Sequence, residues 1–223
     1  MVVNKNLFLR LCRYTNAMKP HRTSYRHRSN LAKIQTPDQV IIELQRVGEH
    51  LPDSDLFEFV FFNRAYVIIT KAIHQASDDG LFSDDKTMNQ LEVAFAHKYF
   101  AALNSYVQAG SLPHSWKHVR RGLLGRHRPA SLSLMLGAHA HINHDLLEAL
   151  RAVIDNPSHF ENDYFKVNQL LLASSKAISK SYYEDAVQLN FLKKHLRSLY
   201  LRPVMQLILH WRTRVWREFA KTA

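Results

Sequence analysis

The sequence predicts an all-α protein, a single-domain bundle of six to eight helices around two buried central helices. From Thr36 almost to the end, apolar residues recur at helical spacing, and no alternating strand pattern survives beside them. Hydrophobic residues make up 46% of the 223 residues, which is enough for a core, and no Pro/Gly/Ser-rich linker divides the chain. We therefore expect one helical domain over residues 36–223.

The first helix is predicted from a capping box. In Thr36-Pro37-Asp38-Gln39 a capping threonine precedes a proline at the first helical position and a glutamine at the third, so a helix should follow over 38–50. Pro52 ends it. A cap within 53–54 begins a long second helix that closes at Gly80. Because this helix is apolar almost all round, we expect it to be central and buried.

The middle of the chain predicts three more helices. Ser83, followed by acids in the first turn, begins a third helix that stops at Gly110. A short basic helix follows around 113–124, and a fifth runs over about 129–154 and forms the second central helix.

The last part of the chain completes the bundle. A sixth helix begins near Ser158 and continues past Leu172, and whether it breaks near 179–181 stays open. The stretch 184–219 is predicted to be helical with a kink or division at Pro203, because proline removes a helix hydrogen bond.

The positive charge lies at the two ends of the chain. Residues 1–37 carry a net charge of +8 and residues 193–223 carry +7, whereas residues 38–192 carry −4. We expect residues 1–35 to form a basic, disordered leader, which also has features of an organelle transit peptide. Because the body is mildly acidic, binding of nucleic acid is not favoured.

Cysteine content and hydropathy limit the cellular setting. The single cysteine, Cys12, excludes an intramolecular disulfide and fits a reducing compartment. No apolar run approaches the length of a transmembrane segment. We expect a cytoplasmic protein, with organelle targeting through the leader as the alternative.

The fifth helix carries four polar side chains at helical spacing, because His141, His144, Asp145 and Glu148 fall at i, i+3, i+4 and i+7. At about 100° per residue they share one stripe of an otherwise apolar helix. Gly137 lies one turn earlier on this stripe and leaves room for a helix or a ligand. Buried charges are costly unless compensated, so these groups must pair, hydrogen-bond or bind a cation.

Other helices also carry polar residues in apolar rows, and we expect them to converge with the fifth helix on one pocket. Each has an ordinary structural role as its alternative, such as a helix cap or a satisfied core hydroxyl. The expected metal ligands are His141, Asp145, Glu92 and Asp163. The expected catalytic residues are His144, Glu148 and Tyr66. The expected substrate-binding residues are Thr70, His74, Tyr99, Trp116 and Asn168.

These residues favour a metal-dependent hydrolase that acts on a phosphoester or a similar small substrate. A divalent metal (zinc, iron or manganese) would lower the pKa of bound water and supply hydroxide. The alternative is a non-enzymatic helical protein that binds an apolar or lipid-like ligand. A third reading takes the basic, aromatic stretch 193–219 as a contact to nucleic acid or anionic lipid, although at helical spacing an amphipathic helix docked on the core is favoured.

The same motifs resemble a known but uncharacterised family. Phe62-Asn63-Arg64-Ala65-Tyr66, the pair Glu92 and Phe95, Leu136-Gly137 and the core Ala140-His141-Ile142-x-x-Asp145-Leu146 are similar to a mainly bacterial family catalogued as a domain of unknown function. The resemblance covers roughly residues 40–218. The resemblance implies that these residues are the functional residues of the protein. The family has no established activity, so the resemblance does not indicate a reaction.

A weaker resemblance is to the all-α zinc-dependent phospholipase C and P1-type nuclease group. Its metal-bearing helix has a Leu-Gly…His-x-x-x-Asp pattern, which Leu136-Gly137…His141-x-x-x-Asp145 is similar to. Those enzymes follow the aspartate with a proline and a further histidine ligand and use an N-terminal tryptophan, whereas Leu146-Leu147-Glu148 follows here. The resemblance therefore does not support a trinuclear zinc centre.

Overall fold

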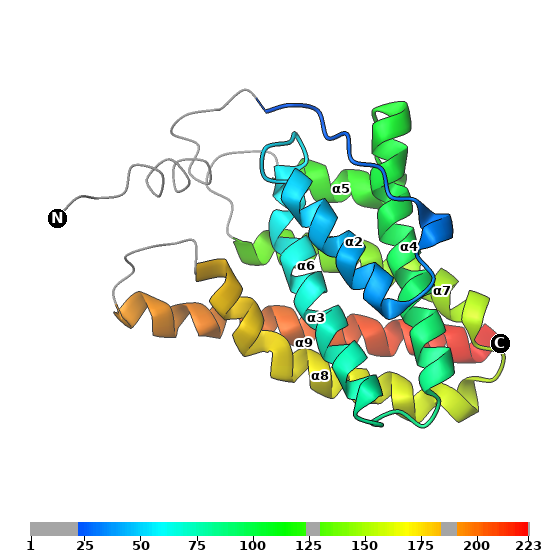
Figure 1. The fold of residues 1–223 in the computed structure, drawn as a ribbon. Helices are drawn as coiled ribbons and strands as arrows, with labels where there is room; N and C mark the ends of the chain where they lie inside the picture. Colours follow the sequence, from blue (N-terminus) through cyan, green and yellow to red (C-terminus); the bar gives the residue numbers. More distant parts are fainter. Residues whose placement is uncertain (1–21, 124–129, 184–190, 223) are drawn as a thin grey trace.

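The computed structural model describes residues 22–123, 130–183 and 191–222, and it confirms an all-α single domain (Figure 1). The described residues contain no β-strand, only an isolated bridge between Thr23 and Ser54. The helices are η1 (Leu31–Lys33), α2 (Pro37–His50), η2 (Phe57–Phe59), α3 (Val60–Asp78), α4 (Asp85–Ala109), α5 (His114–Leu123), α6 (Ala130–Ala140), η3 (His141–Asp145), α7 (Leu146–Val153), α8 (Pro157–Tyr183) and α9 (Phe191–Thr222).

Helix α3 and the composite helix α6–η3–α7 occupy the centre of the bundle. Helix α3 contacts α2, α4, α6 and α8, and the composite helix contacts α3, α4, α5 and α9. In Figure 1, α8 and α9 cross the direction of α3 and α4 in the lower half of the view. Side chains from five helices therefore meet in the middle of the molecule.

Local signals set several helix ends as predicted. The side chain of Thr36 accepts a hydrogen bond from the backbone N–H of Gln39, and the side chain of Gln39 accepts one from the backbone N–H of Thr36, which confirms the capping box. Helix α4 ends at Gly110, whose φ of 66° lies in the left-handed region that glycine adopts without strain.

Helices α8 and α9 are each continuous, α8 at 179–181, where a break stayed open, and α9 at Pro203, where a kink or division was predicted. Helix α8 runs unbroken through 179–181, where the side chain of Ser181 donates to the carbonyl of Ile178. Helix α9 continues across Pro203, although proline leaves one carbonyl of the preceding turn without its usual donor. Of the kink or division predicted at Pro203, the division is therefore wrong, since α9 is one helix that packs against α6, α7 and α8.

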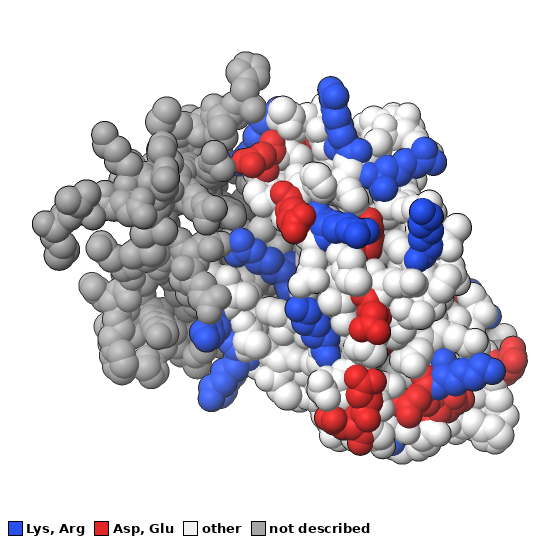
Figure 2. All heavy atoms as spheres, in the orientation of Figure 1, with Lys and Arg blue, Asp and Glu red and all other residues white. Residues whose placement is uncertain are grey.

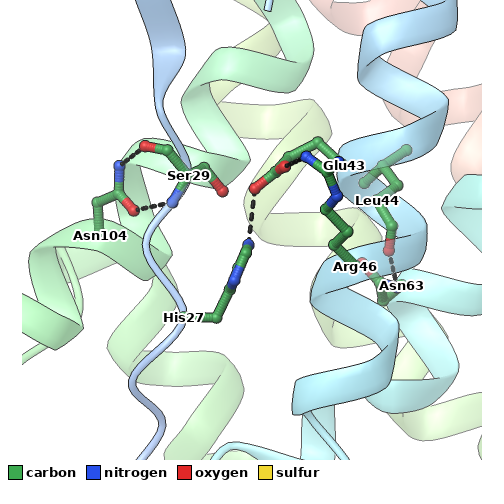
Figure 3. Close-up of polar contacts among 7 residues, drawn as sticks. All are labelled: His27, Ser29, Glu43, Leu44, Arg46, Asn63 and Asn104. Atoms are coloured by element: carbon green, nitrogen blue, oxygen red, sulfur yellow. Dashed lines mark hydrogen bonds and ion pairs between the residues drawn. The ribbon is translucent and has the colours of Figure 1, made fainter. Parts of the chain in front are cut away.

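Residues 22–35, which the sequence analysis placed in the leader, lie against the body of the protein. Asn104 of α4 accepts from the backbone N–H of Ser29 and donates to its carbonyl, at 2.9 and 2.8 Å (Figure 3). His27 donates to Glu43 of α2 at 2.7 Å, and Tyr25 is buried. The segment thus packs against α2 and α4 and includes η1, whereas residues 1–21 lie outside the described part.

Charged side chains of both signs are scattered over one described face of the protein (Figure 2). On the described part of the face in Figure 2, Lys and Arg are interspersed with Asp and Glu. None of the described helices combines the length and the apolar content that crossing a membrane requires.

Candidate functional site

A cavity of about 100 Å³ lies among α3, α4, α6–η3–α7, α8 and α9. Most of its wall is apolar, and the polar residues in the wall are few. The apolar wall includes Phe62, Ile73, Met88, Phe95, Ala138 and Ile208. The polar or ionisable wall consists of Thr70, Tyr66, Tyr164, Glu92, His141 and Arg212. An apolar cavity with a few polar groups is typical of a small-molecule site.

The π-helical turn η3 places His141 and Asp145 on the central helix. A π turn closes its hydrogen bonds between residues i and i+5, and such turns are frequent at functional sites. Within it, Nδ1 of His141 lies 2.8 Å from Oδ2 of Asp145. The same oxygen accepts from Nε1 of Trp116 at 3.2 Å. Because the Asp145 carboxylate accepts from both rings, the Nδ1 of His141 carries the proton, and its Nε2 remains an acceptor.

Aromatic rings enclose the imidazole of His141, which is 3% exposed. Phe95 stacks on it with ring centroids 3.6 Å apart and an interplanar angle of 8°. The other rings around it are Tyr66, Phe62, Trp116 and Tyr99, with centroids 5.0 to 6.2 Å away. This apolar surrounding lowers the pKa of His141, and the hydrogen bond to Asp145 opposes the shift only in part. The imidazole is therefore neutral at physiological pH.

Glu92 and His141 present polar atoms that lack hydrogen-bond partners. Both carboxyl oxygens of Glu92 and the Nε2 of His141 are buried with no partner among the described residues. Burial raises the pKa of Glu92 to about 8, so its carboxyl group is mostly protonated at pH 7. Two neutral, unsatisfied groups thus line the same apolar cavity.

Seven of the twelve predicted site residues lie at the cavity or in contact with His141. Four of them line the cavity, namely Tyr66, Thr70, Glu92 and His141. Three others contact His141 without lining the cavity. Asp145 accepts its hydrogen bond, and Trp116 and Tyr99 contact its ring. The prediction of a shared pocket that includes the polar residues of α3, α4 and the central helix thus corresponds to this cavity.

The structure does not bring His144 and Glu148 to the cavity. Both are exposed, and Glu148 accepts a hydrogen bond from Lys98 at 2.5 Å. His144 faces the ring of His139 at a centroid distance of 6.0 Å. The physical reason is the π turn, which is one residue wider than an α turn and puts later positions out of phase with the 100° repeat.

Asp163 is fully used by structural hydrogen bonds. Its carboxylate accepts from the backbone N–H groups of Ser83 and Asp84, at 2.7 and 2.9 Å, and from Lys166 at 2.8 Å. Burial acts to raise its pKa, but these donors outweigh burial and hold the pKa below its ordinary value. Asp163 therefore connects α8 to the start of α4.

His74 and Asn168 also have partners outside the Glu92 and His141 end of the cavity. His74 lies half-buried at 3.1 Å from Asp38 of α2. Asn168 accepts from Nε of Arg212 at 2.7 Å. Neither side chain lines the cavity wall.

The four expected metal ligands do not form one ligand set. The described residues contain no group of three or more His, Cys, Asp or Glu side chains that could hold a metal ion. His141 and Asp145 bond to each other, while Asp163 lies with Ser83 and Lys166. These side chains do not fit a shared cation in their present positions.

Two polar residues of the cavity wall, Arg212 and Tyr164, were not predicted from the sequence, and Arg212 is the charged one. It lies in α9, is 7% exposed and lines the cavity. Arg212 lies within the basic, aromatic stretch 193–219. A signal was present, because Arg212 interrupts the buried apolar stripe of Leu201, Met205, Ile208 and Val215 at helical spacing.

The chain belongs to the family described as "Family of unknown function (DUF5995)", whose model matches residues 37–223. This confirms the resemblance to a family without a known activity. No curated protein and no solved structure matches the chain, so the phospholipase C and P1-type nuclease group is not among its matches.

Proposed function

We propose that this protein binds a small, largely apolar molecule with a polar group in the central cavity. The observation that carries the proposal is the set of three buried atoms without partners at the cavity, Oε1 and Oε2 of Glu92 and Nε2 of His141. An unsatisfied buried polar group costs about 1–3 kcal/mol. A ligand that donates to His141 and bonds to the Glu92 carboxyl would remove this cost.

The size of the cavity limits the ligand. An engineered apolar cavity of about 150 Å³ in another protein binds benzene. At about 100 Å³, this cavity suits a molecule with one small ring or a short hydrocarbon chain. The neutral state of Glu92 and His141 at pH 7 favours a hydroxyl, amide or carboxyl group at that end.

Titration with benzyl alcohol, followed by two-dimensional NMR of the full chain, tests the proposal. Ala138 lines the cavity, and Ala138→Leu should fill it and abolish binding. Ala152 is exposed on α7, so Ala152→Leu serves as the matched control. We expect saturable shifts at the cavity residues in the wild type and in Ala152→Leu only. Equal binding by a folded Ala138→Leu variant, or no binding by the wild type, would contradict the proposal.

Hydrolysis of a small ester is a second candidate, favoured by the bond between Asp145 and His141. The Nε2 of His141 would take a proton from water as its oxygen bonds to the carbonyl carbon, and the carboxyl group of Glu92 would give a proton to the departing alkoxide. Proton return from His141 to Glu92 completes the cycle. Release of phenol from phenyl acetate should exceed the spontaneous rate and should be lost in His141→Gln but not in the exposed His159→Gln.

Metal-dependent hydrolysis of a phosphoester stays a prediction from the sequence. Among the described residues, those expected to hold the metal do not fit one site. Metal analysis of protein purified without a histidine tag is the test, and near-stoichiometric zinc, iron or manganese would support that prediction.

A further inference from the structure

We infer that the molecule bound in the central cavity is a small apolar carboxylate whose anionic group is held by Arg212. This inference rests on the proposed function and names the chemical class of its ligand. It starts from Arg212 of α9, which lines the cavity together with residues of α3, α4, the central helix and α8. At 7% exposure this charge is removed from bulk solvent.

The protein contacts of Arg212 leave much of its hydrogen-bonding capacity unused. Nε donates to Oδ1 of Asn168 at 2.7 Å, and Nη2 donates to the carbonyl of Tyr164 at 3.1 Å. The guanidinium also lies over the ring of Tyr164, 4.3 Å from its centroid. An arginine has five N–H donors, so about three remain for a ligand.

No acid of the described residues neutralises Arg212. Its contacts are an amide, a carbonyl and a phenol ring, all of them neutral. The two acids that precede Tyr164 on α8 have other partners. Glu161 accepts from Trp216 at 3.0 Å, and Asp163 accepts from Lys166. A buried charge without a counter-charge is costly, and the contact with the Tyr164 ring offsets only part of that cost.

The other ionisable groups of the cavity leave its net charge at +1 at neutral pH. Burial holds Glu92 in its protonated form and His141 in its neutral form, while an arginine stays protonated even though burial lowers its pKa. A monoanion would therefore balance the positive charge of Arg212, and no negatively charged group of the cavity wall would repel it. The planar guanidinium suits a carboxylate, which it can bind through two parallel hydrogen bonds.

Three probes of one shape and different charge test the inference: benzoate, benzyl alcohol and benzylamine. Titrated at pH 7 into the full chain and followed by NMR, benzoate should bind at least about tenfold more tightly than benzyl alcohol, a difference of about 1.4 kcal/mol. Benzylamine should bind more weakly than benzyl alcohol, because Arg212 repels it.

Variants at Arg212 then separate charge from shape. In Arg212→Gln the preference for benzoate over benzyl alcohol should disappear while benzyl alcohol still binds. In Arg212→Lys, which keeps the charge but loses the planar fork, part of the preference should remain. The ratio of the affinities of the wild type for benzoate and benzyl alcohol tests the inference even if a variant does not fold.

The outcomes distinguish this inference from the function on which it rests. If the wild type binds benzyl alcohol as tightly as benzoate, or if a folded Arg212→Gln keeps the full preference, the carboxylate inference is wrong and the apolar binding site stands. If benzylamine binds most tightly, the ligand is a cation paired with Glu92. If none of the three probes binds, the proposed function itself is overturned.

Discussion

Replacing Glu92 by glutamine should flatten the pH dependence of the stability of this protein. In the folded state burial raises the pKa of Glu92 from 4.5 to about 8. Between these values the folded chain holds a proton that the unfolded chain has released. The contribution of this bound proton to the unfolding free energy is therefore fully present below about pH 4.5 and is lost as the pH rises through 8.

The size of the effect follows from the shift. Each unit of pKa corresponds to about 1.4 kcal/mol, so ionisation of Glu92 should remove about 3–4 kcal/mol of unfolding free energy between pH 5 and pH 8. Glutamine has a similar shape and does not titrate. The lowered pKa of His141 makes the unfolding free energy rise with pH at pH values below the ordinary pKa of histidine. This contribution is the same in the wild type and in Glu92→Gln, so it cancels when the two are compared.

Urea unfolding followed by circular dichroism, at steps from pH 5 to pH 9, measures this difference. We expect the unfolding free energies of the wild type and Glu92→Gln to be similar near pH 5, and the variant to be the more stable by about 3–4 kcal/mol at pH 8. The matched control is Glu148→Gln, because Glu148 is exposed and paired with Lys98. Its curve should run parallel to that of the wild type. A parallel curve for Glu92→Gln as well would refute the reasoning.

Three further substitutions test the supports of the site. Asp145→Asn should cost about 1–3 kcal/mol in urea unfolding, because the neutral amide oxygen is a weaker acceptor than the carboxylate oxygen that the ring N–H groups of His141 and Trp116 share. Gly137→Ala should cost about 1–3 kcal/mol, because a Cβ there would lie 2.5 Å from a ring carbon of Phe62, and a double-mutant cycle with Phe62→Leu should recover part of it. Asp163→Asn should destabilise at neutral pH by about 1–3 kcal/mol, with faster amide exchange at the start of α4, and unchanged exchange there would contradict the assigned role.

Local sequence signals were sufficient for most helix boundaries. The capping box at Thr36 and the glycine at 110 act through hydrogen bonds and dihedral angles within a few residues, so their effect is readable without the fold. The continuity of α9 across Pro203 and the docking of residues 22–35 depend on contacts with distant helices. Ser29, for example, is held by Asn104, which lies 75 positions away.

The candidate site was predictable only in part for the same reason. His141 and Asp145 were predicted as metal ligands, and in the structure they form the alternative arrangement, a hydrogen bond to each other, since the i and i+4 positions stay adjacent in the π turn. His144 and Glu148 do not share the face of His141, because the π turn is one residue wider than an α turn. No local signal in this sequence marks the π turn. Arg212 was hidden by its basic neighbours, although its place in the apolar stripe of α9 could have revealed it.

Glu92 and Asp163 show what separates a binding residue from a structural one. Both are buried carboxyl groups on helices of the same bundle, and both were predicted as metal ligands. Asp163 receives three donors from residues brought close by the fold, and its pKa falls. Glu92 receives none among the described residues, and its pKa rises. The same acid-to-amide change should therefore stabilise the protein at position 92 above neutral pH and destabilise it at position 163, because in the first case it removes an uncompensated charge and in the second it removes an acceptor that the fold already uses.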